Sequence, residues 1–265
     1  MSSTTFESII SQIIADSPSG EITEVWNDLI AIAGPSAKDA ILDSIEQYNI
    51  ENTVPVDIDG KSVIISSYNK EGSKFYDPID HKLFSVDHLN RKGLDIEPYN
   101  STTLNAVQQT ILEGLQNYTS TNFPGNVTLA VYPIVEEPAK VAIIIVSTKY
   151  NPSNFWNGDW RSEYIYDSTS KELEGKIDVQ AHYYEDGNVR FKSAKEVKVS
   201  NLEDVVKAIQ EEEENFERNL DSSFSELNEK QFKTLRRKLP ITRSKVNWGK
   251  AIGSYRLGRD AAQGN

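Results

Sequence analysis

The 265-residue chain carries a formal net charge of −12, with 26% charged and 38% hydrophobic residues. This composition is more polar than average but not that of a disordered chain, and the length allows one large domain or two small ones. The absence of cysteine excludes disulfides, thiolate metal sites and cysteine nucleophiles. Because the N-terminus has no signal-peptide pattern and no stretch reaches the roughly 20 apolar residues of a membrane span, we expect a cytoplasmic protein.

The first fifty residues predict three short helices. An apolar stripe with helical spacing comes first: Phe6, Ile9, Ile10, Ile13 and Ile14. A second stripe runs over Ile22–Ile30, and Ser17-Pro18 before it predicts an N-cap followed by a proline in the first turn. Ser36 and Asp39 resemble a capping box that opens a third helix. The short connections favour an antiparallel three-helix unit over residues 1–50.

Residues 51–126 read as a β-hairpin followed by a connecting region. Val54–Ile58 and Lys61–Ser67 flank Asp59-Gly60, a pair that strongly predicts a two-residue turn. Short strands are also expected at Phe75–Tyr76 and Leu83–Val86.

Residues 127–225 predict a sheet and a long helix. Five strand candidates follow one another with no helix between them: Val127–Tyr132, Val141–Ser147, Trp160–Tyr166, Ile177–Tyr183 and Val189–Phe191. Their succession predicts an antiparallel sheet. Val141–Val146 is apolar throughout, as expected of a central strand that is covered on both faces.

A long helix should follow the sheet and cover it, which makes the fold class α+β. Ser200 and Glu203 match a capping box at its start. A helix from 201 to 220 would be about 30 Å long. The four carboxylates of Glu211–Glu214 would point around this helix, so we interpret them as a solvated face and not as a cation site.

The last forty residues, 226–265, form a basic arm in this interpretation. Ten of the 28 lysine and arginine residues lie between Glu229 and Asp260 with no acidic residue among them, which leaves 18 basic against 40 acidic residues elsewhere, a net of −22. A helix is expected over Glu226–Leu239, where Pro240 ends it. Trp248, Ile252 and Tyr255 follow at helical spacing.

Two kinds of partner fit this arm. Arginine and tryptophan dominate interface hot spots, and spaced apolar anchors with a cationic face suit a hydrophobic groove that has an acidic rim. The same pattern suits an anionic membrane surface. Nucleic acid is disfavoured because the acidic body would repel the phosphate backbone.

No catalytic, cofactor or metal site is predicted. The phosphate-binding, dinucleotide-binding, zinc-protease and serine-hydrolase motifs are absent from the sequence. The three histidines, His81, His88 and His182, are scattered. We therefore expect a non-enzymatic binding protein, with a hydrolase that uses a carboxylate pair as the alternative, because such a pair leaves no local motif.

Two stretches carry a family resemblance. Asn154–Ser162 (NFWNGDWRS) and Leu235–Trp248 (LRRKLPITRSKVNW) closely resemble the signature stretches of the F-actin capping protein alpha subunit family, and the sequence is similar to its fungal branch. The order of predicted elements also resembles that family. Asp159 stands where several relatives have a basic residue or histidine.

The resemblance implies a function. In that family the alpha subunit pairs with a like-folded beta subunit, the two sheets join side by side, and both C-terminal arms engage the barbed end of an actin filament. Independently of Ca²⁺, the heterodimer blocks the addition and loss of actin subunits, and acidic phosphoinositides act on the basic patch as inhibitors. The implied location is the cortical actin cytoskeleton of the cytoplasm. The alternative is a peripheral protein that uses its arm to bind phosphoinositides on membranes.

The resemblance also assigns residues. Lys233, Arg237 and Arg243 fall on the actin-contacting basic positions of the family. The same arm supplies further candidates for actin binding: Arg236, Lys238, Lys245, Trp248, Lys250, Ile252 and Arg256. Of these, Trp248 and Ile252 would be apolar anchors or would pack the arm on its own body. Asn154–Trp160 is expected to serve the fold, by holding a loop at the sheet edge with buried aromatic side chains.

Overall fold

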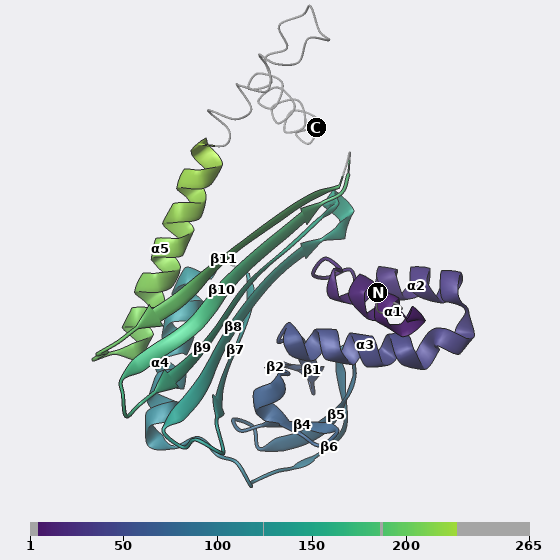
Figure 1. Cartoon of the computed structure of the whole chain (residues 1–265). Helices are drawn as coiled ribbons and strands as arrows, with labels where there is room; N and C mark the ends of the chain where they lie inside the picture. Colours follow the sequence, from purple (N-terminus) through teal and green to yellow (C-terminus); the bar gives the residue numbers. More distant parts are fainter. Residues whose placement is uncertain (1–4, 124, 186–187, 227–265) are drawn as a thin grey trace, which may run out of the picture. The chain divides into compact units, whose positions relative to one another are not determined.

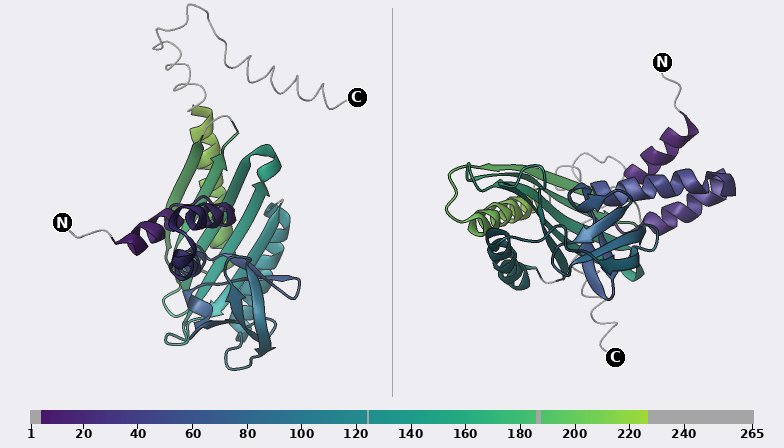
Figure 2. Two further views of the ribbon diagram at one scale, coloured as in Figure 1. Left: turned by 90° about the vertical axis from the view of Figure 1, so that its right-hand side faces the viewer. Right: turned by 90° about the horizontal axis from the view of Figure 1, so that it is seen from below.

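The computed structural model describes residues 5–123, 125–185 and 188–226 (Figure 1). The chain divides into two compact units, residues 1–213 and residues 214–265. The elements described below belong to the first unit, apart from the second half of the last helix. Figure 2 shows the same elements from two further directions.

Three α-helices open the chain: α1 (Phe6–Ala15), α2 (Ile22–Ala33) and α3 (Lys38–Glu51). They bury a common apolar cluster whose main members are Ile10, Ile14, Leu29, Ile41, Ile45 and Tyr48. The predicted apolar stripes of these helices are therefore the surfaces that pack. Burial of these side chains, and not intrinsic helix propensity, stabilises helices as short as these.

The predicted caps of α2 and α3 are wrong. Ser17 donates its hydroxyl to the Ile13 carbonyl oxygen at 2.9 Å, so it closes the end of α1 and does not open α2. The cap position of α2 is Glu21, which makes no side-chain cap hydrogen bond. A short 3₁₀ turn over Pro35–Ala37 leads into α3, which likewise begins without a side-chain cap. Backbone turns, and not side-chain caps, therefore lead into α2 and α3.

A six-stranded sheet follows, in the order β2-β1-β6-β5-β4-β3. Its strands are β1 (Pro55–Ile58), β2 (Lys61–Ile64), β3 (Lys70–Glu71), β4 (Lys74–Asp77), β5 (Lys82–Asp87) and β6 (Lys92–Pro98). The hairpin β1–β2 is confirmed, and both turn residues, Asp59 and Gly60, have the positive φ of a primed turn (52° and 81°). The strands β3 and β6 were not predicted, and β6 pairs with β1 in the parallel sense.

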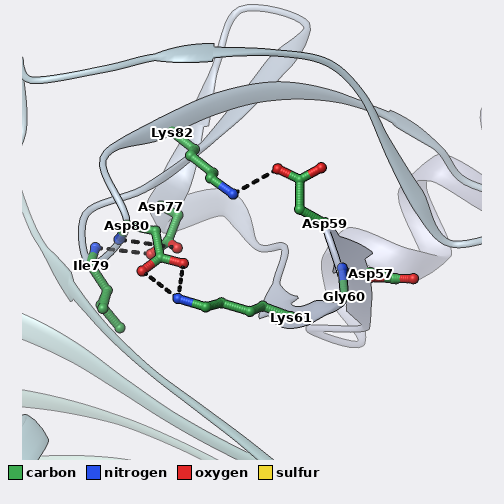
Figure 3. A network of polar contacts seen from close by, with 8 residues as sticks. All are labelled: Asp57, Asp59, Gly60, Lys61, Asp77, Ile79, Asp80 and Lys82. Carbon is green, nitrogen blue, oxygen red and sulfur yellow. Dashed lines mark hydrogen bonds and ion pairs between the residues drawn. The ribbon is translucent and has the colours of Figure 1, made fainter.

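Polar contacts at one end of this sheet join two of its turns (Figure 3). Lys61 Nζ lies 2.5 and 2.8 Å from the two carboxylate oxygens of Asp80, and Lys82 Nζ lies 2.8 Å from Asp59 Oδ2. Asp77 is buried and accepts hydrogen bonds from the backbone N–H groups two and three residues ahead. Burial raises the pKa of Asp77, and those two hydrogen bonds oppose the rise. The acidic cluster is therefore held by cations and backbone amides of the protein itself.

The helix α4 (Ala106–Asn122) was not predicted. Asn105 and Gln108 form a reciprocal capping box at its start, with hydrogen bonds of 3.0 and 2.9 Å. Its buried apolar residues include Ile111, Leu112 and Leu115. Both the capping pair and the helical spacing of Ile111, Leu112 and Leu115 are present in the sequence, so this helix could have been predicted from it.

The second sheet is the predicted five-stranded antiparallel one. Its strands are β7 (Asn126–Pro133), β8 (Lys140–Asn151), β9 (Trp156–Asp167), β10 (Glu172–Tyr183) and β11 (Val189–Val199). Their order in space is β11-β10-β9-β8-β7, so each strand pairs with its neighbour in the chain. Val141–Val146 of β8 is buried throughout, as predicted.

The two faces of β8 are buried by different parts of the chain. Ala142, Ile144 and Val146 pack in one cluster with Ile64 and Tyr76 of the six-stranded sheet. On the other face lie α4 and the first turns of α5 (Val205–Glu226) (Figure 1). This explains why β8 has no polar alternation.

The helix α5 starts later than predicted. The carboxylate of Asp204 accepts hydrogen bonds from the backbone N–H groups of Val206 and Lys207, at 2.9 and 3.1 Å, and so acts as the cap. Ser200 instead donates its hydroxyl to Glu172 at 3.2 Å. The expected cap is four residues too early, because two capping patterns lie close together in this segment.

We predict that Gly175→Ala destabilises the protein strongly. A Cβ at Gly175 in β10 would lie 2.2 Å from the Glu163 carbonyl oxygen and 2.8 Å from Tyr164 Cα, both of them backbone atoms that cannot move aside. Such overpacking should lower the free energy of unfolding by about 1–3 kcal/mol. Urea unfolding measures it.

Gly158→Ala is the matched control, since Gly158 lies in the adjacent strand β9 and a Cβ there has 3.4 Å to its nearest neighbour. Equal effects of the two substitutions would contradict the prediction.

Candidate functional site

The predicted actin-binding residues lie outside the residues that the structure describes. These are Lys233, Arg236, Arg237, Lys238, Arg243, Lys245, Trp248, Lys250, Ile252 and Arg256. Their assignment therefore stays a prediction. The described part of the chain ends on α5, the helix that precedes this segment in the sequence.

A buried glutamate joins the first half of α5 to two other elements. Glu213 is 2% exposed and accepts a hydrogen bond from Tyr118 of α4 at 2.7 Å and another from Tyr164 of β9 at 3.0 Å. Burial raises the pKa of Glu213, although hydrogen bonds from Ser162 and the two tyrosines counteract it. Burial and the nearby carboxylate also raise the pKa of Tyr164.

The structure corrects the prediction of a solvated carboxylate run on α5. Glu213 is buried, and Glu212 pairs with Lys195 of β11 at 2.6 Å. Only Glu211, 3.7 Å from Lys207 one turn earlier, behaves as the predicted solvated face. The sequence could not reveal this, because the tyrosines that donate hydrogen bonds to Glu213 are 49 and 95 residues away.

The stretch Asn154–Ser162 lies at the start of a central strand and not in a loop at the sheet edge, because β9 runs between β8 and β10. Trp156 and Trp160 are only half-buried, and the indole N–H of Trp160 donates to Ser162 Oγ at 2.8 Å. Asn157 is buried and donates its side-chain amide to Glu21 at 3.1 Å. The expected loop at the sheet edge, held by buried aromatic side chains, is therefore wrong: Asn157 and Asp159 are the buried side chains here.

The structure explains why an acidic residue stands at position 159. It forms a buried ion pair with Arg161 at 2.8 Å, with the side chains 1% and 11% exposed. Arg161 also donates to Asn52 at 3.0 Å. Burial raises the pKa of Asp159 and the Arg161 guanidinium lowers it. Asn52 ends α3, so this pair joins the helical cluster to the sheet.

His182 makes a second polar joint between the helices and the sheet. Its Nδ1 lies 2.6 Å from Glu21 Oε1 at the start of α2, and its Nε2 lies 2.9 Å from Asn188 Oδ1. Its ring stacks on Tyr184 at 5.1 Å. Within the described residues, no group of three or more histidine, aspartate or glutamate side chains is placed to hold a metal ion.

The outer strand β11 is the exposed edge of the five-stranded sheet. It carries five charged side chains: Arg190, Lys192, Lys195, Glu196 and Lys198. Beside it, an open groove is lined by charged residues of β9, β10 and β11. Two of the carboxylates there have lysine partners: Glu174 pairs with Lys198, and Asp178 pairs with Lys176. Such paired charges suit recognition of a partner chain better than acid–base chemistry.

Comparison with known proteins supplies the family. The model of the F-actin capping protein alpha subunit family matches residues 10–260. The F-actin-capping protein subunit alpha of Candida glabrata is 61% identical over 259 residues, 98% of each chain, and that of Saccharomyces cerevisiae is 58% identical over 267 residues, 100% of each. The chain belongs to the F-actin capping protein alpha subunit family. The relative from Neurospora crassa is 38% identical, over 97% of each chain.

The family resemblance deduced from the two signature stretches is thus confirmed, and the relatives named above are fungal. The family is one of actin-capping proteins and not a known enzyme family. A solved structure, the homodimeric actin capping protein alpha subunit of Plasmodium berghei, shares the fold with a TM-score of 0.70 at 23% identity, covering 90% of this chain and 98% of that one. Among the described helices, none is long and apolar enough to span a membrane.

We predict a pH-dependent effect of Glu213→Gln on stability. A carboxyl whose pKa is raised in the folded state adds most to the free energy of unfolding at pH values below its unfolded pKa of about 4.3. This stabilisation is lost as the pH rises through the folded-state pKa. Between about pH 4 and pH 8, the free energy of unfolding of the variant should therefore rise relative to that of the unsubstituted chain. Urea titrations across this range measure the difference.

The control is Glu211→Gln, two positions earlier on α5 and 62% exposed. Its effect should change little with pH. A Glu213→Gln difference that is flat, or that falls with rising pH, would contradict the prediction.

We predict that Asp159 and Arg161 are energetically coupled. Arg161→Met leaves the Asp159 carboxylate buried without its cation, which should cost about 3–5 kcal/mol. Adding Asp159→Asn removes the buried charge and should restore part of the loss. A double-mutant cycle of unfolding free energies tests this, and additive effects would show that the pair is not coupled.

Proposed function

We propose that this chain is the alpha subunit of a heterodimeric capping protein that binds the barbed end of actin filaments and blocks subunit addition and loss there. The observation that carries the proposal is the family match over residues 10–260, which includes all ten predicted actin-binding residues. The function thus rests on the basic arm as well as on the body.

The arm supplies the contact with actin in this proposal. Lys233, Arg237 and Arg243 dock on acidic surfaces of actin, while Trp248 and Ile252 provide apolar anchors. A body of net charge −22 with a basic arm orients the molecule as it approaches an acidic partner. In this proposal capping is independent of Ca²⁺, as the family resemblance implies.

A beta subunit of like fold is the second partner. The exposed edge of β11 offers 11 residues of strand to which the sheet of another chain can pair. Pairing there would place the two sheets side by side. Two arms held on one body would then reinforce each other through effective concentration.

Acidic phosphoinositides are proposed as inhibitors that compete for the same basic patch, and the cortical actin cytoskeleton is the proposed location. A protein that binds only membranes would use the same residues. Sedimentation with anionic vesicles and with filaments separates the two proposals: binding to vesicles without binding to filaments would replace capping by the membrane function.

The decisive experiment is pyrene-actin elongation from barbed-end seeds, with the chain co-expressed with a beta subunit. The intact dimer should stop elongation. The triple variant Lys233→Ala, Arg237→Ala, Arg243→Ala should need about tenfold or more protein for the same block, because long-range attraction and three ion contacts are lost.

The matched control removes three lysines from the body, Lys61→Ala, Lys140→Ala and Lys207→Ala, which changes the net charge equally. If the control weakens capping as much as the arm variant, the assignment of the arm residues is wrong. A well-folded dimer that leaves elongation unchanged would refute the capping function itself.

A further inference from the structure

The middle of α5 packs on the rest of the chain through polar side chains. Residues 210–215 (QEEEEN) contain no apolar side chain, whereas Ile209 before them and Phe216 after them are buried. Over more than one helical turn, apolar burial therefore gives this helix no preferred rotation about its axis. Polar contacts must supply that preference, and the contacts of Glu212 and Glu213 do so.

Glu213 enters a site that is built of hydrogen-bond donors. The hydroxyls of Tyr118 and Tyr164 donate to its two carboxylate oxygens, at 2.7 and 3.0 Å, and the buried hydroxyl of Ser162 donates as well. The donors come from two elements, α4 and β9. Because hydrogen bonds are directional and these donors converge, they demand an acceptor at one place on the helix surface.

The end of the stretch Asn154–Ser162 takes part in this site. Trp160 donates its indole N–H to Ser162 Oγ at 2.8 Å, and its ring meets that of Phe123 edge-on at 6.1 Å. Phe123 directly follows α4. Through Ser162, the last residues of this signature stretch are thus connected to Glu213 of α5, which gives them a task outside their own sheet.

Glu212 holds the helix from another side. Lys195 of β11 pairs with the Glu212 carboxylate at 2.6 Å and also donates to the Glu212 backbone carbonyl at 3.3 Å. Successive residues of an α-helix point about 100° apart. Glu212 and Glu213 therefore bind different elements at a wide angle, and together they oppose rotation of α5 in either direction.

Such buried polar groups select one arrangement more than they add stability. Replacing them by apolar groups of similar volume is often neutral or stabilising, and their best documented use is to fix the register of a helix. α5 is one continuous helix from Val205 to Glu226, so a rotation at Glu213 is carried to its last residue. The predicted actin-binding residues, from Lys233 onward, follow α5 in the sequence.

We propose that Glu213 is a positioning residue for capping. Together with Glu212 it sets the rotation of α5, and thereby the direction in which the chain continues toward the basic arm. The inference rests on the proposed function and deepens it, because it assigns a requirement for capping to a residue that does not touch actin.

An all-apolar replacement separates positioning from stability. The triple variant Glu213→Met, Tyr118→Phe, Tyr164→Phe removes the buried carboxylate together with the tyrosine hydroxyls that donate to it. As a dimer with a beta subunit, it should unfold at the same urea concentration as the unsubstituted dimer or at a higher one. The protein concentration that half-blocks pyrene-actin elongation should nevertheless rise by about fivefold or more.

A zero-length cross-link reports the setting of α5 directly. Carbodiimide joins a lysine to a carboxylate that it contacts, and Lys195 and Glu212 form such a pair at 2.6 Å. The internal reference is Lys74 with Glu97, a pair at 2.7 Å in the six-stranded sheet. Peptide mass spectrometry of the triple variant should show the first cross-link reduced about threefold or more relative to the second.

Glu213→Gln and Tyr76→Phe are the matched controls. Glu213→Gln keeps the shape and an acceptor oxygen, so capping and cross-linking should stay within about twofold of the unsubstituted dimer. Tyr76→Phe removes a buried tyrosine hydroxyl of the six-stranded sheet, which donates to the Tyr68 carbonyl oxygen at 3.0 Å, and should change neither. A loss with Glu213→Gln as large as that of the triple variant would show that charge alone matters and would overturn the inference.

The remaining outcomes are also decisive. A folded triple variant that caps like the unsubstituted dimer, or that caps weakly with an unchanged cross-link, would refute the positioning role. If the triple variant does not fold, Tyr118→Phe takes its place, because it removes one donor only, and its expected loss of capping is about twofold. If the unsubstituted dimer does not block elongation, the proposed function fails, while the cross-link yield still shows whether Glu213 sets the rotation of α5.

Discussion

The fold depends on the burial of β8 from both sides. Its run Val141–Val146 is apolar without interruption, so neither face of the strand can be left in water. One face is buried by the six-stranded sheet and the other lies toward α4 and α5. Residues far apart in the sequence must therefore come together on this strand before any of them is stable. The remaining elements take their positions from this requirement.

Polar contacts then fix how the layers meet. The helical cluster is joined to the sheet by Arg161 with Asn52 and by His182 with Glu21, both of them largely shielded from water. Hydrogen bonds between buried polar groups are directional, and a group left without its partner would pay the full cost of desolvation. Apolar packing would tolerate several arrangements of helix on sheet, whereas these contacts favour one. Glu213 has the same role for α4, β9 and the first half of α5.

The strand β11 connects the fold to the proposed assembly. The sheet is closed on the β7 side by contacts with the six-stranded sheet, such as Thr128 with Ser62 at 2.9 Å, while the β11 side ends in a charged strand. Because the β7 edge is covered and the β11 edge is a regular strand, another chain can extend this sheet only on the β11 side. The polar composition of the chain agrees with this, since part of its surface is suited to be covered by another chain.

The sequence by itself determined the elements with strong local patterns. These are the apolar stripes of the three N-terminal helices, the hairpin at Asp59-Gly60, the five consecutive strands and the family resemblance in Asn154–Ser162 and Leu235–Trp248. Each depends on residues within a few positions of one another, where periodicity and turn chemistry act directly. The assignment of the arm residues also came from the sequence, and it remains a prediction.

Only the tertiary structure decided the features that depend on distant partners. The sequence predicted a solvated Glu213 because its neighbours in sequence are carboxylates. In the structure it is buried and accepts hydrogen bonds from two tyrosines of other elements. Arg161, the partner of Asp159, is only two residues away, but the burial of this pair at the end of α3 depends on Asn52, which is 109 residues from Arg161 in sequence. Two strands of the six-stranded sheet were not predicted, because β3 has only two residues and β6 pairs with β1 in the parallel sense across a long loop of chain. Long-range contacts of this kind leave no periodic trace in a single sequence, since the free energy that selects them arises only when the chain is folded.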